Sequence, residues 1–459
     1  MLKTKSQTLN MLEGSILKNI IRYTVPIMLT SLLQLLFNAA DLIIVGRYCG
    51  EISVAAVGNV ASVTSLLVNL FVGFAAGTSV TVAQALGARR DKEVQRIVHT
   101  AIPTALISGV LVTIIGLVCA EPILKQMNTP ETVFPLSMVY LRIYFSGAIF
   151  LMLYNFCAAI LRAAGDTKTP LIFLTIGGIV NVVLNVIFVT IFQMNVAGVA
   201  LATTISQAVS ALLVFHRMRK REHACRLIFS KMKIDKSYLL KIVYIGLPAG
   251  LQSALFSISN IMIQSSINPF GDILMSGNAA AGNIEGFIYI ILNSFMQTAL
   301  NFIGQNVGAE QYKRAKKIFG SCLGSVLAVG IVITSLVYLL GPALLSVYIT
   351  DSPEAIQWGM VRLSCICFAY CICGMMEVTT GALRGMGAAI VPMLTSVLGV
   401  CGIRIVWIYT IFQLPRYHTP QCLYYSYPLS WTVTFLIQLF AFFLIYRKFS
   451  LRAAAKRMV

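Results

Sequence analysis

The sequence predicts an all-α polytopic membrane protein with twelve transmembrane helices, arranged as two parallel six-helix repeats. Three observations lead to this fold class. First, 58% of the 459 residues are hydrophobic and only 11% are charged, whereas soluble domains carry about 25% charged residues. Second, long apolar stretches recur from one end of the chain to the other. Third, the sequence of the first half returns, in the same order, in the second half.

The apolar stretches are predicted to be membrane-spanning helices. A stretch of about 18 apolar residues or more can cross roughly 30 Å of hydrocarbon. A helix is expected because backbone polar groups in lipid must be satisfied within each span. In chain order the predicted spans are 20–46, 53–79, 97–119, 137–161, 170–192, 196–215, 242–267, 277–303, 318–339, 358–383, 391–413 and 427–446.

Positive charge is distributed unevenly between the connections. Of the 35 Lys and Arg residues, 29 fall in the termini and in every second connection, while the opposite connections hold little beyond Arg47, Lys125 and Arg416. This asymmetry predicts that both termini lie in the cytoplasm. It also assigns the net charge of +19 to contact with the lipid bilayer, so that no nucleic-acid partner is expected.

The internal repeat fixes the expected organisation. Pro26 is followed 222 residues later by Pro248, and the same spacing relates "LRAAGDTKTP" from Leu161 to "LRGMGAAIVP" from Leu383. Each half holds six spans, an even number, so both halves enter the membrane in the same orientation. The predicted domains are an N-terminal lobe (1–216), a basic cytoplasmic linker (217–237) and a C-terminal lobe (238–459).

The repeated segments are predicted to be tight turns at equivalent cytoplasmic corners. In each copy a glycine, Gly165 or Gly387, permits the turn, and a proline, Pro170 or Pro392, stands near the start of the next helix.

A polar cluster in the first half is the candidate cation site for H⁺ or Na⁺. Asp41 lies about 7 Å from the outer end of the first span, at 1.5 Å per residue. Asn181 and Asn185, four residues apart, share one face of the fifth span, and Thr203 lies at a similar depth in the sixth. Their oxygens are hard donors that suit Na⁺, and a desolvated carboxylate can carry H⁺. The alternative is that these groups only hydrogen-bond helices together.

A second set of polar residues is the candidate substrate or second acidic site. Ionisable residues inside spans are costly and indicate function. Either glutamate of this set could attract a cationic substrate or serve a second proton step, or the arginine could neutralise one of them. The set comprises Glu285, Glu377, Asn155, Asn260 and Arg404.

Several other functions find no support in the sequence. No phosphate-binding loop of the G-x-x-x-x-G-K-[ST] type occurs, and no pair of catalytic groups indicates an enzyme. Four cysteines between Cys365 and Cys373 cannot all lie on one face of a helix, so no metal site is expected beyond Na⁺ at Asp41. An ion-coupled carrier without a cofactor is therefore the simplest interpretation.

The motifs "FNAADLIIVGRYCG", "QALGAR" with its echo "QNVGAE", "LYNFCAAILRAAGDTKTP", "GVALATTISQ" and "LRGMG...P" resemble those of the multidrug and toxic compound extrusion (MATE) family along nearly the whole chain. The resemblance implies a V-shaped antiporter in the bacterial inner membrane. It would export amphipathic, cationic drugs or toxic compounds in exchange for H⁺ or Na⁺, and a monomer is expected.

The resemblance also places a cation site at Asp41 and its neighbours, with one departure. Many members carry an acid in an "N-x-x-L-D" motif of the fifth helix, where this chain reads "NVVLN" and has Asn185. The choice of coupling ion is therefore open. So are two other functions: a flippase for lipids or lipid-linked oligosaccharides, and a passive channel or membrane enzyme.

Overall fold

The computed structural model describes residues 8–127, 129–220, 224–349 and 352–458. Within these ranges the chain is almost entirely helical and contains no strand. Ten helices are long and apolar enough to cross a membrane, and two further pairs of helices, each bent by more than 40°, bring the number to twelve. The predicted class of a twelve-helix, all-α polytopic membrane protein is confirmed.

The helices of the first half follow the six predicted spans and extend beyond most of them at their polar ends. The fourth span is divided by a bend of 47°. The elements are α1 (Ile16–Tyr48), α2 (Glu51–Gly87), α3 (Asp91–Gln126), α4 (Phe134–Ser146), α5 (Ala148–Ala163), α6 (Lys168–Val186), the π-helix η1 (Ile187–Ile191) and α7 (Asn195–Arg219).

The second half repeats this order after the short helix η2 (Phe229–Lys231). Its fourth span is again bent, by 50°. The elements are α8 (Lys236–Ile267), η3 (Asn268–Phe270), α9 (Asp272–Gly308), α10 (Tyr312–Leu339), α11 (Gly341–Ser346), α12 (Pro353–Ile366), α13 (Tyr370–Gly385), α14 (Ile390–Ser396), the π-helix η4 (Val397–Gly402), α15 (Ile403–Tyr409), η5 (Ile411–Gln413), η6 (Pro415–Tyr417) and α16 (Pro420–Met458).

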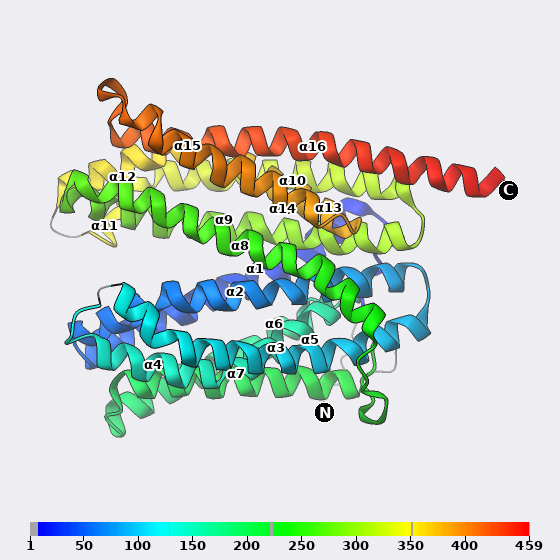
Figure 1. Ribbon diagram of the computed structural model, residues 1–459, viewed down its shortest axis with the longest axis horizontal. Coiled ribbons are helices and arrows are strands. Elements are labelled where there is room, and N and C mark those ends of the chain that lie inside the picture. The colour runs from blue at the N-terminus through cyan, green and yellow to red at the C-terminus, as the bar shows by residue number, and fades with distance from the viewer. Residues whose placement is uncertain (1–7, 128, 221–223, 350–351, 459) are drawn as a thin grey trace. The chain divides into compact units, whose positions relative to one another are not determined.

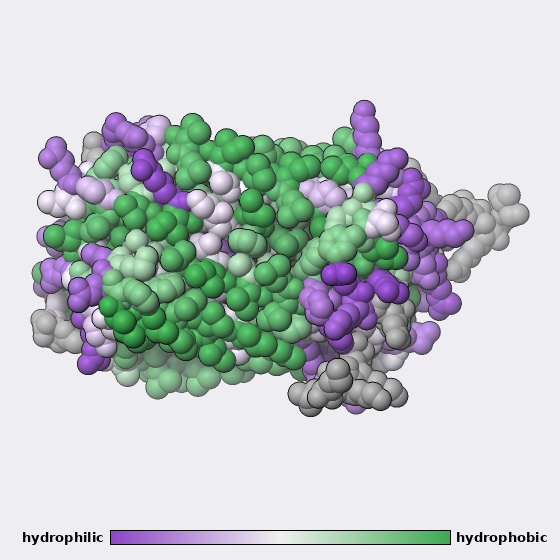
Figure 2. All heavy atoms as spheres, turned by 90° about the horizontal axis from the view of Figure 1, so that it is seen from below, coloured by the Kyte–Doolittle hydropathy of each residue, from purple (hydrophilic) through white to green (hydrophobic). Residues whose placement is uncertain are grey.

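The surface of the helices is that of a protein in lipid. Large apolar side chains such as Ile107 and Ile179 are half exposed or more in the middle of long helices. Figure 2 shows one face on which hydrophobic residues fill the middle and hydrophilic residues gather at both ends. Within each unit, the connections between consecutive spans in Figure 1 alternate between the two ends of the helices.

The backbone repeats as the sequence does. Gly165 and Gly387 have φ angles of 85° and 86°, a left-handed conformation that glycine adopts without steric cost. The predicted tight turns at these two corners are therefore confirmed. Two further pairs of left-handed residues stand 221 positions apart, so that three corners of the first half recur in the second: Gly50 with Gly271, and Arg89 with Glu310.

The chain forms two compact units, and two helices, α1 and α8, each belong partly to one unit and partly to the other. The first unit comprises residues 1–10 and 29–253, and the second comprises 11–28 and 254–459. The N-terminal part of α1 thus belongs to the second unit, and the N-terminal part of α8 to the first. Each of these helices contains an internal proline at the repeated position, Pro26 or Pro248.

These two packing units differ from the two lobes predicted from the sequence, which are separated by the linker at residues 217–237. The predicted lobes describe the sequence repeat and stay a prediction. The described part of that basic segment, residues 217–220 and 224–237, belongs to the first unit. Residues 221–223 lie outside the described ranges.

Candidate functional site

The carboxylate of Asp41 lies at the centre of a buried polar cluster in the first unit. Asp41 is 7% exposed, near the C-terminal end of α1. The side-chain amide of Asn185 donates to Asp41 Oδ1 at 2.5 Å. The hydroxyl of Thr203, on α7, donates to Asp41 Oδ2 at 3.3 Å. The structure therefore brings together side chains from three helices that are distant in the sequence.

The two asparagines of α6 connect this cluster internally. Asn181 and Asn185 are one helical turn apart, and Asn185 Nδ2 donates to Asn181 Oδ1 at 3.3 Å. Asn181 Nδ2 in turn donates to the hydroxyl of Thr203 at 3.3 Å. All four predicted residues therefore form one hydrogen-bonded network. One acceptor is left over, because the buried Oδ1 of Asn185 has no hydrogen-bond partner among the described residues.

The helix geometry changes directly after the asparagine pair. α6 ends at Val186 and continues as the π-helix η1, which covers Ile187–Ile191. A π-helical turn is rare and occurs frequently at functional sites. Asn185 is thus presented at the last regular turn of its helix.

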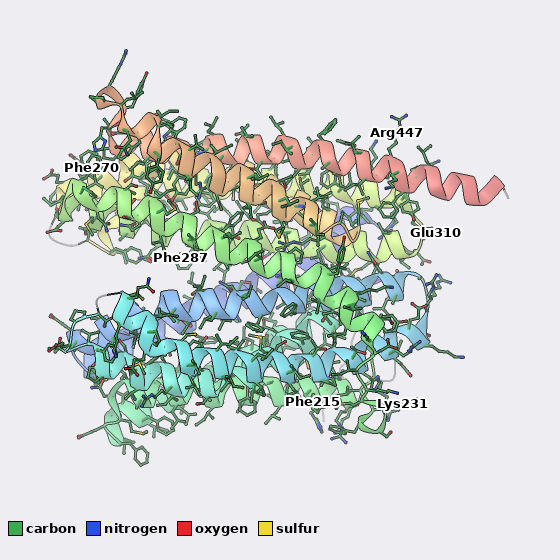
Figure 3. The ribbon with its side chains drawn as sticks, in the orientation of Figure 1. Phe215, Lys231, Phe270, Phe287, Glu310 and Arg447 are labelled. Carbon is green, nitrogen blue, oxygen red and sulfur yellow. The ribbon has the colours of Figure 1, made fainter. Side chains whose placement is uncertain are left out.

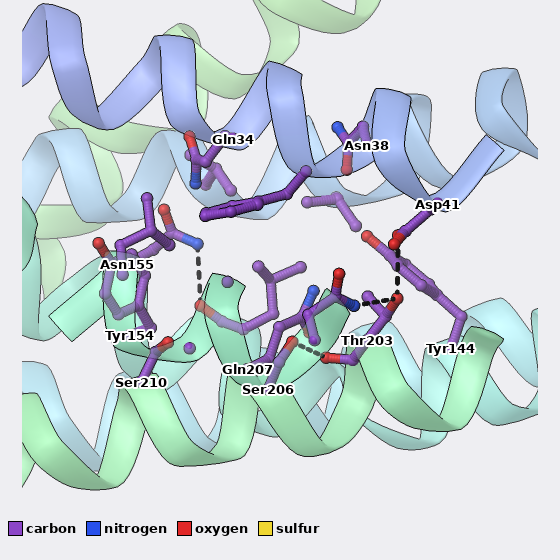
Figure 4. A pocket seen from close by; sticks show the side chains of 18 of the residues that line it. Gln34, Asn38, Asp41, Tyr144, Tyr154, Asn155, Thr203, Ser206, Gln207 and Ser210 are labelled. Atoms are coloured by element: carbon purple, nitrogen blue, oxygen red, sulfur yellow. Dashed lines mark hydrogen bonds between the residues drawn. The ribbon is translucent and has the colours of Figure 1, made fainter. Parts of the chain in front are cut away.

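The network borders a cavity of about 350 Å³ in the first unit. Asp41, Asn181 and Thr203 line its wall together with Asn155, which the sequence had placed in the second candidate set. Figure 4 shows these polar side chains around the cavity, with α1 on one side and α7 on the other. Further polar lining residues were not predicted: Gln34, Asn38, Asn69, Tyr144, Tyr154, Ser206, Gln207 and Ser210.

A periodic signal for part of this lining was present in the sequence. Gln34, Asn38 and Asp41 follow one another at four and three residues in an apolar helix, which places them on one face. Ser206 and Ser210 extend the face of Thr203 on α7 in the same way. Both stripes are thus periodic signals in the sequence that identify further polar residues of the cavity wall.

The remaining members of the second predicted set do not line this cavity. Glu285, Glu377, Asn260 and Arg404 all belong to the second unit, whereas Asn155 belongs to the first. The five residues are therefore divided between the two units.

Glu285 is held in a buried ion pair. Arg362, on α12, donates through Nε to Glu285 Oε1 at 2.8 Å and through a terminal nitrogen to Oε2 at 2.7 Å. The hydroxyl of Tyr370 donates to Oε2 at 3.2 Å. A second terminal nitrogen of Arg362 donates to Asn278 Oδ1 at 2.6 Å. The hypothesis that Arg404 neutralises this glutamate is therefore wrong, because Arg362 already occupies both of its oxygens.

Arg404 is satisfied by neutral groups instead. Its Nε donates to the hydroxyl of Ser430 at 3.2 Å, and a terminal nitrogen donates to Asn260 Oδ1 at 3.2 Å. Its guanidinium lies 4.0 Å from the centre of the Tyr427 ring, within the range of a cation–π interaction. No ion pair of Arg404 occurs among the described residues.

Glu377 is buried in α13 and interacts electrostatically with Arg384, two turns further along the same helix, and with Tyr289 of α9. The two predicted glutamates, Glu285 and Glu377, thus have different partners. Among the described residues no group of three or more His, Cys, Asp or Glu side chains could hold a metal ion.

The fold and this site define a multi-pass helical membrane protein with a polar, acid-containing cavity inside a helix bundle, an arrangement typical of transporters. Comparison with known proteins gives the family. The family model described as MatE matches twice, over residues 26–187 and 248–410. The two matches begin 222 residues apart, which is the spacing of the repeat.

Individual relatives match over most of the chain. The Bacillus subtilis protein named "Probable multidrug resistance protein YoeA" is 26% identical over 436 residues, 93% of each chain. A protein of Shewanella oneidensis named "FAD transporter" is 23% identical, with 85% of this chain and 86% of the relative covered. The solved structure of a MOP superfamily transporter from Pyrococcus furiosus has a TM-score of 0.90 at 20% identity, covering 97% of this chain and 99% of that one.

The chain belongs to the MATE family of multidrug resistance transporters. It is accordingly a multi-pass membrane transporter of small molecules and not an enzyme.

Proposed function

We propose that this protein is a secondary antiporter that exports amphipathic, cationic drugs or toxic compounds in exchange for H⁺ or Na⁺. The observation that carries this proposal is the position of Asp41. Its carboxylate is buried, lines the cavity of the first unit and is contacted by neutral donors only. A buried acid without a fixed cationic partner is available to exchange one bound cation for another.

The lining of the cavity favours a cationic or neutral substrate over an anion. The side chains around it comprise one carboxylate, several amides and hydroxyls, and the aromatic rings of Phe37, Tyr144 and Tyr154. Aromatic rings attract organic cations, and no Lys or Arg is among the described lining residues. The phosphates of a molecule such as FAD, or of a lipid-linked pyrophosphate carried by a flippase, would find no cationic partner in this cavity.

Two coupling ions fit the same cluster. A proton taken up by Asp41 would give one carboxylate oxygen a hydrogen to donate and would make that oxygen a weaker acceptor for the group, Asn185 or Thr203, that now donates to it. Na⁺ would use the carboxylate together with the amide and hydroxyl oxygens of the network. The unpartnered Oδ1 of Asn185 is one such oxygen. These two modes predict different driving gradients.

The proposal also includes the orientation of the protein in the membrane. The concentration of Lys and Arg at the termini and in alternate connections supports an orientation with both termini in the cytoplasm of a bacterial cell and the protein in its inner membrane. All described lining residues of the cavity belong to the first unit, and we propose that the transporter acts as a monomer.

Transport driven by imposed gradients tests this proposal. Purified protein is reconstituted into liposomes, and efflux of the fluorescent cation ethidium is measured under an inward H⁺ gradient, an inward Na⁺ gradient or neither. We expect one gradient to drive efflux by the wild type but not by Asp41→Asn. Asp272→Asn, at an exposed position at the start of α9, is the matched control and should behave as wild type. Equal transport by Asp41→Asn, or no response to either gradient, would contradict the proposal.

A further inference from the structure

A second cavity, of about 430 Å³, lies in the first unit where α3 begins. One wall is the first two turns of α3, and the other is the segment that precedes α8. This segment is the connection that contains Lys231 in Figure 3. The lining residues are Lys92, Gln95, Arg96 and His99 of α3, and Lys231, Lys233 and Asp235 of the connection.

The connection is fixed to α3 by specific hydrogen bonds. The backbone N–H of Ile228 donates to His99 Nε2 at 3.0 Å, while His99 Nδ1 lies 2.6 Å from the carbonyl of Gln95. Both ring nitrogens of His99 are thus engaged, with Nδ1 as the donor. The hydroxyl of Thr100 accepts from the N–H of Asp235 at 3.1 Å. Since Leu227 is also 2% exposed, the connection forms a fixed wall of the cavity.

Positive charge dominates this cavity. Four of its lining residues are cations, Lys92, Arg96, Lys231 and Lys233, and one is an anion, Asp235. The anion is already bound, because Arg96 forms an ion pair with it and the hydroxyl of Ser237 donates to it at 2.6 Å.

The charges of this cavity do not cancel. Hydrogen bonds from Ser237, with Arg96, hold the pKa of Asp235 below its usual value, so it stays ionised at neutral pH. The three lysines form no ion pair with the carboxylates of the described residues. The cavity therefore has an excess of three positive charges.

We propose that this cavity binds the phosphate of an anionic phospholipid headgroup, such as that of phosphatidylglycerol. Ammonium and guanidinium groups converging in a cavity suit a phosphodiester. A lipid is favoured over a free phosphate because of the adjoining surface. α8 begins directly after Asp235, and along it Leu240, Tyr244 and Leu247 are each more than 40% exposed. A headgroup in the cavity would leave its acyl chains against this apolar surface, at the level where polar connections meet the membrane. The inference does not depend on the proposed antiport.

The second repeat offers a matched comparison. Lys313 and Lys317 of α10 stand 221 residues after Lys92 and Arg96, and both are exposed. Gly320 occupies the position that corresponds to His99. Because glycine has no side chain, the hydrogen bond that fixes the wall of the cavity in the first unit cannot form there. The same charges are thus present on α10 without the side chain that anchors the wall.

Lipid titration of variants tests the proposal. The full-length protein in a neutral detergent is titrated with dihexanoyl phosphatidylglycerol, dihexanoyl phosphatidylcholine or inorganic phosphate, and its thermal unfolding midpoint and bound lipid (by native mass spectrometry) are measured. The cavity variant is Lys231→Gln with Lys233→Gln, and the control is Lys313→Gln with Lys317→Gln. We expect phosphatidylglycerol alone to raise the midpoint of the wild type and the control.

The cavity variant should need about 30-fold more phosphatidylglycerol for the same shift, since each of the two lysines contributes about 1 kcal/mol to binding of an anionic headgroup and about 1.4 kcal/mol corresponds to a factor of ten. An equal response of the cavity variant and the control would overturn the site. An equal response to phosphatidylcholine would overturn the role of charge. An equal response to inorganic phosphate would contradict the proposal that the bound phosphate belongs to a lipid. Because no transport is measured, none of these outcomes depends on the antiport mechanism.

Discussion

The two units share a repeated backbone but treat buried charge in opposite ways. In the first unit, Asp41 accepts hydrogen bonds from neutral groups and lines a cavity. In the second, both oxygens of Glu285 are bound by Arg362. The position 222 residues after Asp41 is the apolar Ile263, so the acid of the first unit has no counterpart in the second.

This difference separates a candidate working site from a structural one. A carboxylate whose charge is already balanced by a fixed arginine gains little from binding a second cation, and removing either partner leaves an uncompensated buried charge. A carboxylate among amides and hydroxyls has no such fixed partner. The repeat thus preserves the fold in both halves, while only the first half shows, among the described residues, an acid that is free of a cationic partner at a cavity.

The largest expected effect is a separation of transport from stability at Asp41. Asp41→Asn keeps the shape of the side chain and leaves no buried cation unpaired, so the thermal unfolding midpoint should stay close to that of the wild type. Gradient-driven efflux should fall to background because the amide cannot exchange ions. Efflux from liposomes and thermal unfolding of the same preparation measure the two effects. If Asp41→Asn instead unfolds at a much lower temperature than the wild type, Asp41 has a structural role like that of Glu285.

The reverse result is expected in the second unit. Glu285→Gln leaves Arg362 buried without a carboxylate, which should lower the free energy of unfolding by about 3–5 kcal/mol. The double variant Glu285→Gln with Arg362→Met removes both charges and should be less destabilised than the single one. Equilibrium unfolding in mixed micelles gives both values, and Glu354→Gln, an exposed acid of α12, is the control. A double variant that is less stable than the single would contradict the pairing as the main interaction of Arg362.

Most of the fold could be predicted from the sequence because its signals are local or periodic. Apolar length gave the twelve spans, and the repeated glycines gave the tight turns at Gly165 and Gly387. Depth along each helix was enough to expect Asp41 near the asparagines of α6. Charged helix ends, such as the first turns of α3 from Asp91, were missed because a hydropathy signal covers only the apolar residues, although the helix begins earlier.

The rest depends on direction around the helix axis and on packing over long distances. The pairing of Glu285 with Arg362 could not be predicted, since a sequence gives the depth of two side chains in a membrane but not whether they face each other. The passage of residues 11–28 into the second unit has no sequence signal of its own either. It is a property of how α1 packs, and no local pattern specifies it.

The two units also differ in the contacts that hold α1 and α8, the two helices that are shared between the units. In the first unit, α8 packs against α2 through glycines on both helices: a Cβ on Gly73 would lie 2.3 Å from the backbone nitrogen of Gly250 and 2.5 Å from the carbonyl oxygen of Gly246. Small residues let helix backbones approach closely in membranes. The residue 222 positions before Gly246 is Thr24, so the corresponding contact in the second unit has a different chemistry.

Alanine at the glycine contact should therefore be costly. Gly73→Ala forces two backbones apart, and we expect it to lower the free energy of unfolding by about 1–3 kcal/mol. At Gly58, in the same helix, a Cβ would have no neighbouring atom within 4 Å, so Gly58→Ala should instead stabilise the protein by about 0.5–1 kcal/mol. Equilibrium unfolding of both variants measures the difference. Equal effects would show that α2 and α8 can separate at little cost.

The smallest effect on the free energy of unfolding is expected where α1 contacts α9 in the second unit. There a hydrogen bond takes the place of the glycine contact between α2 and α8. The hydroxyls of Thr24 and Thr298, on α1 and α9, are 2.8 Å apart, and hydrogen bonds between membrane helices contribute on average only about 0.6 kcal/mol. Each hydroxyl also lies within hydrogen-bonding distance of a carbonyl of its own helix, of Ile20 or Ser294. It can donate to that carbonyl when it does not donate to the other hydroxyl, so the loss of one partner is partly compensated.

A double-mutant cycle with Thr24→Val and Thr298→Val measures this coupling directly, since it cancels the effect of each substitution on its own helix. Thr190→Val is the control, because that exposed hydroxyl bonds only within its helix. We expect a coupling well below the cost of Gly73→Ala. The α1 contact of the second unit would then be easier to separate than the α8 contact of the first. A coupling as large as the glycine effect would instead mean that α1 and α8 are held with equal strength, in spite of their different chemistry.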